Sequence, residues 1–254
     1  MERSSNAPAT DLFDKCHQFT QAKELIEQGV YPYFLPLEDT EGCEITFKGR
    51  QLVMIGSNNY LGLSTHPKVR AAAIEAVERY GTSCTGSRFL NGTLALHHEL
   101  DRRMAEFIGM ESSICFSTGY QANVGAISAL IGRRDLFVAD KEAHASLIDG
   151  FKMSAGTMKR FRHNDMDHLE SILKKNKNDY AGMLVAVDGV YSMGGDIVPL
   201  PEVVEICKRH GARVMVDDAH GLGVMGKGNG TVAHFDMAKE VDLVMGTAFD
   251  GQER

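Results

Sequence analysis

Apolar residues in the first part of the chain recur mainly at the spacing of helices. The pattern predicts one helix over Asp11–Gly29, with Gly29 as its stop, and further helices over Pro67–Tyr80 and Leu94–Ile108. Two short runs rich in β-formers, Glu44–Phe47 and Gln51–Ile55, flank a Lys-Gly-Arg turn. They predict a β-hairpin, so the first helix and this hairpin are expected to form an arm.

After the third predicted helix, short apolar runs alternate with helical patterns. The predicted strands are Ser113–Ser117, Leu136–Ala139, Met158–Phe161, Met183–Val187, Arg213–Val216 and Leu243–Gly246. The predicted helices between them are Gln121–Leu130, Ala145–Met153, Met166–Lys175 and Pro201–His210. Strands that are almost wholly apolar and alternate with helices indicate an α/β fold, in which helices cover both faces of a mainly parallel sheet. We therefore expect an arm over residues 1–57 and a larger α/β domain over residues 58–254.

Composition and charge narrow the function classes. The 254 residues carry 27 Lys and Arg against 34 Asp and Glu, a net charge of −7, which argues against a general nucleic-acid or anionic-membrane surface. No apolar run reaches the ~18–20 residues of a membrane span, and the polar first ten residues lack the apolar core of a signal peptide. Five widely spaced cysteines without a CxxC pair favour a reducing compartment, the cytoplasm.

A glycine turn joins one predicted strand to the next helix. Gly119 lies in the segment STGYQAN, where the free N–H groups of a helix start can bind an anion such as a phosphate. An ordinary strand-to-helix turn is the alternative, and this feature alone does not distinguish the two.

Acidic and histidine side chains follow a second strand. Asp217 and His220 lie in the run VMVDDAHG (214–221), directly after the apolar residues of the strand. There, a partly buried carboxylate can pair with a cationic ring nitrogen, and a histidine can bond the same ligand. A helix-capping Asp with a solvated His is one alternative, and a metal site is another. No HxxxH, HxH or HExxH pattern supplies further ligands, so no metal is expected.

Two further strands end close to polar side chains. His144 follows Leu136–Ala139 at the head of a helix, where a flat imidazole can stack on a planar cofactor or simply cap the helix. Ser192 follows Met183–Val187 and places a hydroxyl near a strand end. Because a parallel sheet gathers the carboxyl ends of its strands at one edge, we expect these side chains to lie around one ligand site.

Six ordered motifs together resemble one known family. They are SNNYLGL (57–63), GSRFLNGT (86–93), STGY (117–120), AHAS (143–146), RHND (162–165) and VDDAHGLG (216–223). The chain is similar from about Gly29 to Thr247 to the α-oxoamine synthases, fold-type I enzymes that use pyridoxal 5'-phosphate (PLP) and include 8-amino-7-oxononanoate synthase, glycine C-acetyltransferase and serine palmitoyltransferase. GSRFLNGT is most similar to the bacterial serine-palmitoyltransferase type.

The resemblance implies a cytoplasmic acyltransferase that condenses an amino acid with an acyl-CoA, with loss of carbon dioxide. PLP would be the electron sink, and the full-length protein would be a homodimer. In this chain, His144 would stack on the cofactor ring and Asp217 would keep its nitrogen protonated, while Ser192 and His220 would contact the side of the ring hydroxyl. His144, Asp217 and His220 are thus the implied catalytic residues.

The resemblance also assigns the phosphate and the substrate. The backbone of Gly119 and Tyr120 and the hydroxyl of Thr247 would hold the phosphate, and Asn59 and Tyr60 would line the substrate side. No metal, nucleic acid or stable membrane insertion is implied.

The last residues depart from the family. Asp250 stands at the third position after Thr247, where the family has the lysine that binds the cofactor, and a carboxylate cannot form a Schiff base. The family's C-terminal small domain is also missing from the 254 residues, so we expect a truncated chain that is inactive alone. A non-catalytic partner subunit of a competent homologue, or another fold-type I enzyme such as an aminotransferase, remains an alternative interpretation. A Rossmann-type nucleotide binder is disfavoured because no GxGxxG follows the first strand.

Overall fold

The computed structural model describes residues 11–247, and the chain divides into two units, residues 1–55 and 56–254. The break falls close to the end of the arm expected from the sequence. The assignment of that arm and of the larger domain as functional parts stays a prediction.

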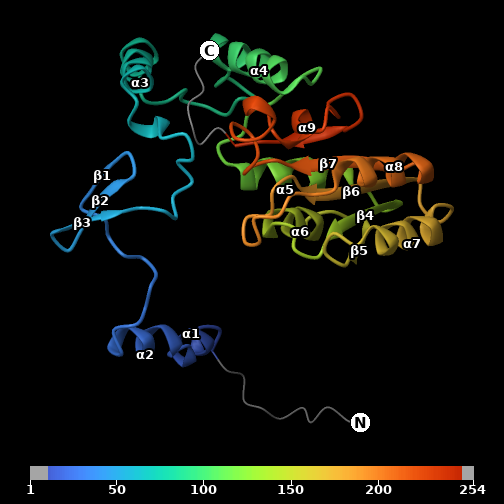
Figure 1. The fold of residues 1–254 in the computed structure, drawn as a ribbon, viewed down its shortest axis with the longest axis horizontal. Helices are drawn as coiled ribbons and strands as arrows, with labels where there is room; N and C mark the ends of the chain where they lie inside the picture. Colours follow the sequence, from blue (N-terminus) through green and yellow to red (C-terminus); the bar gives the residue numbers. More distant parts are fainter. Residues whose placement is uncertain (1–10, 248–254) are drawn as a thin grey trace. The chain divides into compact units, whose positions relative to one another are not determined.

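The first unit holds two short helices and a small antiparallel sheet (blue in Figure 1). Its elements are α1 (Asp14–Gln18), α2 (Gln21–Glu27), β1 (Asp39–Glu41), β2 (Glu44–Phe47) and β3 (Arg50–Val53). The single helix predicted over Asp11–Gly29 is wrong, because Phe19 leaves helical geometry at ψ 88°. Thr20 then precedes α2, and its hydroxyl donates to Glu24 Oε1 at 2.6 Å without capping the backbone of the helix.

The predicted hairpin is present with a shifted second strand. β2 pairs antiparallel with β3, and Glu44 lies opposite Val53. Lys48 and Gly49 form the turn with φ values of 51° and 69°, the conformation of a two-residue turn with positive φ at both positions. β1 was not predicted, because its three polar residues show no alternation, yet it pairs with β2.

The second unit begins with two helices that the sequence predicted almost residue for residue. They are α3 (Pro67–Tyr80) and α4 (Ala95–Ile108), and the 3-10 turn η1 (Leu63–Thr65) precedes α3. Pro67 occupies the first turn of α3, where a missing N–H costs nothing. Gly81 and Gly109 end the two helices at positive φ.

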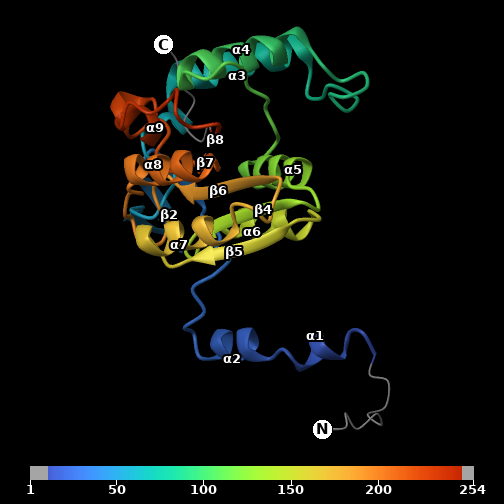
Figure 2. The same ribbon diagram turned by 90° about the vertical axis from the view of Figure 1, so that its right-hand side faces the viewer.

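A five-stranded parallel sheet organises the rest of the unit, in the order β5-β4-β6-β7-β8 (Figure 2). The strands are β4 (Asp135–Asp140), β5 (Thr157–Phe161), β6 (Gly182–Asp188), β7 (Arg213–Asp217) and β8 (Leu243–Met245). The helices are α5 (Gly119–Leu130), α6 (Ala145–Lys152), α7 (Met166–Asn176), α8 (Leu200–His210) and α9 (Thr231–His234), with the 3-10 turn η2 (Gly226–Gly228). The predicted α/β class, with a parallel sheet, is confirmed.

Alternate residues of the strands face opposite layers of helices. Leu136 and Val138 of β4 belong to a buried cluster with α7 and α8, whereas Phe137 packs in a second cluster with Ile127 of α5 and Leu147 of α6. This division follows the two-residue period of a strand. Helices therefore cover both faces of the sheet, as predicted.

The strand predicted over Ser113–Ser117 is wrong. The segment is extended but pairs with no strand among residues 11–247. Side chains hold it instead: Cys115 N–H donates to Asp101 Oδ1 at 3.0 Å, and Arg88 Nη1 donates to the Cys115 carbonyl at 3.2 Å. A strand needs a neighbouring backbone, which local apolar spacing cannot supply.

In the described part of the chain, no helix is long and apolar enough to cross a membrane. All five cysteines are free thiols.

Candidate functional site

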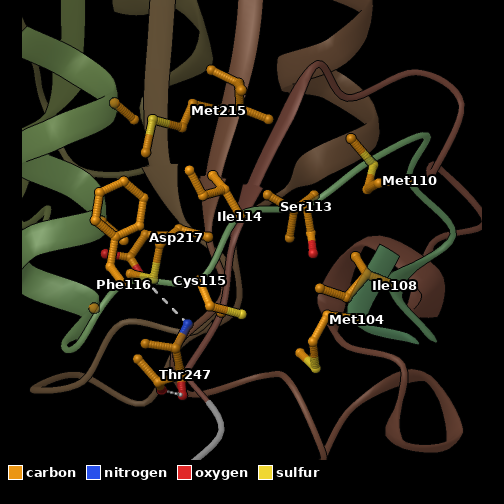
Figure 3. Close-up of a pocket in the computed structure, with 18 of the residues that line it drawn as sticks. Met104, Ile108, Met110, Ser113, Ile114, Cys115, Phe116, Met215, Asp217 and Thr247 are labelled. Atoms are coloured by element: carbon orange, nitrogen blue, oxygen red, sulfur yellow. Dashed lines mark hydrogen bonds between the residues drawn. The ribbon is translucent and has the colours of Figure 1, made fainter. Parts of the chain in front are cut away.

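A cavity of about 1230 Å³ lies at the carboxyl ends of the central strands. One part of its wall is apolar and includes Met104, Ile108, Ile114 and Phe116, which Figure 3 shows around the same space as Asp217. The polar part of the wall comes from the starts of α5 and α6 and from the ends of β6, β7 and β8; it includes Thr118, Gly119, Tyr120, His144, Asp188, Asp217, His220 and Thr247. Six residues named from the sequence therefore share one cavity.

The start of α5 presents its backbone to the cavity. Thr118 caps the helix, with its hydroxyl oxygen accepting from Gln121 N–H at 3.1 Å. A Cβ added at Gly119 would lie 2.5 Å from Thr247 Cγ2, so only glycine fits between the helix start and the end of β8. The Thr247 hydroxyl donates to the Ala219 carbonyl at 3.1 Å. A helix start without side chains in front of it is suited to an anion.

Asp217, the last residue of β7, supplies a buried acid. Its side chain accepts from Asn123 Nδ2 at 2.7 Å and from Ala219 N–H at 3.2 Å, and the residue is 4% exposed. Burial raises the pKa of Asp217, and its hydrogen bonds and the nearby His144 and His220 oppose that rise only in part. Among residues 11–247 no lysine or arginine pairs with it.

Asn123 is a site residue that the sequence argument missed. It is fully buried on α5, and its amide nitrogen donates both to Asp217 and to Ser146 Oγ, at 2.8 Å for the latter. Its amide oxygen is buried and has no partner among the described residues. One sequence feature could have indicated it: Asn123 is a polar amide in the first turns of a helix that is mostly apolar or small from Val124 on.

His144 stands at the start of α6 with an exposed ring. Its Nδ1 lies 2.6 Å from Ser146 Oγ, and its backbone N–H donates to Asp188 Oδ1 at 3.2 Å. These bonds hold the residue from two sides while its side chain stays exposed. A flat ring held in this way can stack on a planar ligand.

Asp188, at the end of β6, is a second buried acid in the cavity wall. Burial, and then the nearby Asp217 carboxylate, raise its pKa to about 8. Two acids that share a dry site cannot easily both be charged, so the cavity favours a cationic group or a proton. No role was predicted for Asp188 from the sequence.

His220 is fixed by a residue far away in the sequence. Tyr60 Oη lies 2.7 Å from His220 Nδ1, and His220 lines the cavity whereas Tyr60 does not. The structure therefore places Tyr60 at the site, but through His220.

Besides Tyr60, two predicted residues are not part of the cavity wall. Asn59 is bound to its own turn, with Nδ2 donating to Ser64 Oγ at 2.8 Å, and Asn58 lines the cavity instead. Ser192 is exposed on the loop after β6 and is not part of the cavity wall. Their contacts with a substrate or cofactor stay predictions. Asp250, the residue at the expected lysine position, lies outside the described residues.

No group of three or more His, Cys, Asp or Glu side chains within residues 11–247 is arranged to hold a metal ion. The cavity wall instead combines a helix start suited to an anion, buried acids suited to a cation, and the imidazole of His144.

Comparison with known proteins gives the family. Residues 50–248 match the family model of aminotransferase class I and II. A serine palmitoyltransferase of Bacteriovorax stolpii is 54% identical over 228 residues, which cover 89% of this chain and 54% of the relative. An 8-amino-7-oxononanoate synthase of Geobacter sulfurreducens is 45% identical over 229 residues, covering 89% of this chain and 58% of the relative.

Similar solved structures include enzymes of the same kind as these relatives. A serine palmitoyltransferase of Sphingomonas wittichii has a TM-score of 0.89 and 40% identity, covering 94% of this chain and 60% of that one. A variant serine palmitoyltransferase of S. paucimobilis with a bound PLP–myriocin aldimine has a TM-score of 0.89 and 37% identity, covering 94% and 61%. The chain thus spans little more than half the length of the relatives it matches. It belongs to the aminotransferase class I and II family and, within it, to the α-oxoamine synthases, which include its serine palmitoyltransferase and 8-amino-7-oxononanoate synthase relatives.

Proposed function

We propose that this chain forms the PLP-binding core of an acyltransferase that condenses an amino acid with an acyl-CoA, releasing carbon dioxide and CoA. The observation that carries the proposal is Asp217, a buried carboxylate in the cavity wall that pairs with no lysine or arginine among the described residues. A protonated pyridine nitrogen is a cation of the right shape for such a group.

The other residues of the cavity fit the rest of the cofactor. The N–H groups of Gly119 and Tyr120, at the start of α5, would hold the phosphate, and Thr247 would add its hydroxyl. The exposed ring of His144 would stack on the pyridine, and His220 would bond at its hydroxyl side. When bound, PLP supplies an electron sink for the carbanion that decarboxylation leaves.

In this proposal, Asp217 is the counter-charge of the ring nitrogen. Its charge keeps the ring nitrogen protonated, and Asn123 and the Ala219 backbone hold the carboxylate in place. Because the carboxylate is buried, it does not have to exchange water when the ligand binds. His144 and His220 would orient the ring.

The residue at position 250 limits the proposal. With Asp250 where the family has its lysine, we expect this chain to bind PLP only reversibly and to have negligible activity alone. The amino acid, the acyl-CoA and a homodimer of the full-length form belong to the proposal too, as does a cytoplasmic location, which the five free thiols support.

The test is a PLP titration of the purified chain, followed by borohydride reduction and mass mapping. We expect reversible binding, no adduct on one specific lysine, and affinity at least ~10-fold lower in Asp217→Asn because the ring nitrogen loses its counter-charge. Asp179→Asn changes an exposed acid in the same way and is the control. Equal affinity in Asp217→Asn would overturn the cofactor site. A specific lysine adduct with turnover of an amino acid and an acyl-CoA would overturn the expected inactivity.

A non-catalytic subunit is the second candidate, and the acidic residue at position 250 favours it. In that case the chain pairs with a full-length homologue that carries the lysine. Co-expression and co-purification of the two chains in a fixed ratio would support it, whereas separate elution would remove it.

A further inference from the structure

His163, in the turn after β5, bridges two acids that belong to different segments. Its Nδ1 lies 2.9 Å from Asp140 Oδ1, and its Nε2 lies 2.5 Å from Asp196 Oδ2. Asp140 is the fully buried last residue of β4, and Asp196 lies in the loop after β6. The rings of His163 and Tyr191 also pack in a T-shaped arrangement, with centroids 4.5 Å apart.

Asn164 reinforces the same bridge. Its backbone N–H donates to Asp140 Oδ2 at 3.0 Å, and its side-chain nitrogen donates to Asp196 Oδ2 at 3.0 Å. Asn164 adopts a φ of 49°, a conformation that asparagine tolerates better than most residues. One histidine and one asparagine therefore join three turns at the carboxyl edge of the sheet.

Two of the joined turns carry residues of the proposed cofactor site. Asp140 is four residues before His144, and the turn between them is tied to Asp140 by Glu142 N–H at 2.8 Å. Asp196 is in the loop that carries Ser192, and Tyr191 N–H donates to the Asp196 carbonyl at 3.0 Å within it. A shift of the bridge would move both loops.

The bridge requires a particular protonation state. A carboxylate only accepts hydrogen bonds, so a ring that bonds one at each nitrogen must donate from both, and that form is the imidazolium. Partial burial lowers the pKa of His163, but the bonds to Asp140 and Asp196 and their charges outweigh it and raise the pKa overall. The other titratable groups that face it are Asp188 and Tyr191, while Arg162 is paired with Asp165 at 2.7 Å.

We propose that doubly protonated His163 is a positioning residue, which clamps the loop of residues 189–198 to the end of β4 and so holds the Ser192 and His144 turns for the cofactor. Its effect on binding rests on the proposed function. The clamp itself does not, and the two are tested separately.

Direct evidence comes from nitrogen NMR of the histidine rings in the full chain, with His163 assigned from the spectrum of His163→Gln. We expect both ring nitrogens protonated at neutral pH. In Asp196→Asn the bridge keeps an acceptor but loses a charge, so the titration midpoint of His163 should fall by ~1 pH unit or more. A singly protonated ring at neutral pH, or an unchanged midpoint, would overturn the clamp.

Hydrogen exchange measures the protection of backbone amides in the loop of residues 189–198, and it needs no cofactor. The amides of Tyr191, Gly195 and Val198 all bond within it, at 3.0, 2.7 and 3.1 Å. His163→Gln should exchange these amides ~10-fold faster because glutamine has one donor nitrogen and no charge, whereas the imidazolium donates from two separate ring nitrogens. His98→Gln, which alters an exposed histidine of α4, should leave them unchanged. Equal protection in the two variants would refute the clamp.

The PLP dissociation constant as a function of pH then connects the clamp to the site. We expect affinity in the parent chain to drop ~5-fold above the His163 midpoint, at a lower pH in Asp196→Asn, and with no such step in His163→Gln. A step that persists in His163→Gln would refute the positioning role. If no variant binds PLP, the proposed function fails, while the NMR and exchange results still decide the clamp.

Discussion

Single residues at the carboxyl ends of the strands give the site its character. Asp188 and Asp217 are both buried in the cavity wall, and burial raises the pKa of each. Such acids are unfavourable as neighbouring anions and favourable beside a cation. The sequence predicted Asp217 from its place after an apolar strand. It did not predict Asn123, which donates to Asp217 although 94 positions separate the two.

The raised pKa of Asp188 predicts a pH-dependent stability. Between the ordinary Asp pKa of 3.8 and about 8, folded Asp188 holds a proton that the unfolded chain has lost, so the free energy of unfolding falls as pH rises through this window. Asp188→Asn removes this dependence. Relative to the parent, the variant should gain on the order of 3 kcal/mol between pH 5 and pH 8 in urea melts without cofactor. A constant difference across that range would contradict the shift.

Gly119 predicts a steric effect at the same scale. Because a Cβ there would meet Thr247 Cγ2 at 2.5 Å, Gly119→Ala should push the end of β8 from the helix start. PLP affinity is expected to fall ~10-fold, about 1.4 kcal/mol, in the titration described above. Gly125→Ala, whose Cβ would meet Phe116 at 3.0 Å, introduces a milder clash in the same helix and is the control.

At the scale of elements, the helix starts and strand ends that form the site depend on local capping. Thr118 caps α5, His144 caps α6 and Asp165 caps α7, each through a side-chain acceptor. Capping is a short-range effect, which explains why the helix boundaries could be predicted closely. The Ser113–Ser117 segment could not, because its backbone partners are the side chains of Arg88 and Asp101.

Removing the cap of α5 tests this scale. Thr118→Ala leaves the Gln121 N–H without its acceptor and should lower the free energy of unfolding by ~1 kcal/mol in urea melts. Ser128→Ala deletes a hydroxyl within the same helix and should cost less than ~0.5 kcal/mol. Equal costs would show that the cap does not stabilise the helix.

At the scale of the whole molecule, the second unit exposes large apolar side chains. Phe89 is 94% exposed, Leu90 80% and Ile114 70%. Exposed apolar surface of this kind promotes association. The core itself is ordinary, with two buried clusters that fill the two sides of the parallel sheet.

We predict that the isolated chain forms irregular oligomers. In sedimentation velocity, the parent should show a broad distribution that shifts to smaller species in a Phe89→Ser, Leu90→Ser double variant, because the association buries these side chains. Ile26→Ser, in the first unit, is the control. A monodisperse dimer with one cooperative melt would contradict the prediction.

The sequence by itself determined the α/β class, most helix and strand boundaries, and the residues Gly119, His144, Asp217 and His220 around one cavity. These follow from short-range patterns: apolar period, capping, and polar residues at strand ends. Only the tertiary structure decided that Ser113–Ser117 is no strand, that Asn59 and Ser192 lie away from the cavity, and that Tyr60 bonds His220 from 160 positions away. Hydrogen bonds between residues that folding brings together produce no periodic pattern in the sequence around either partner.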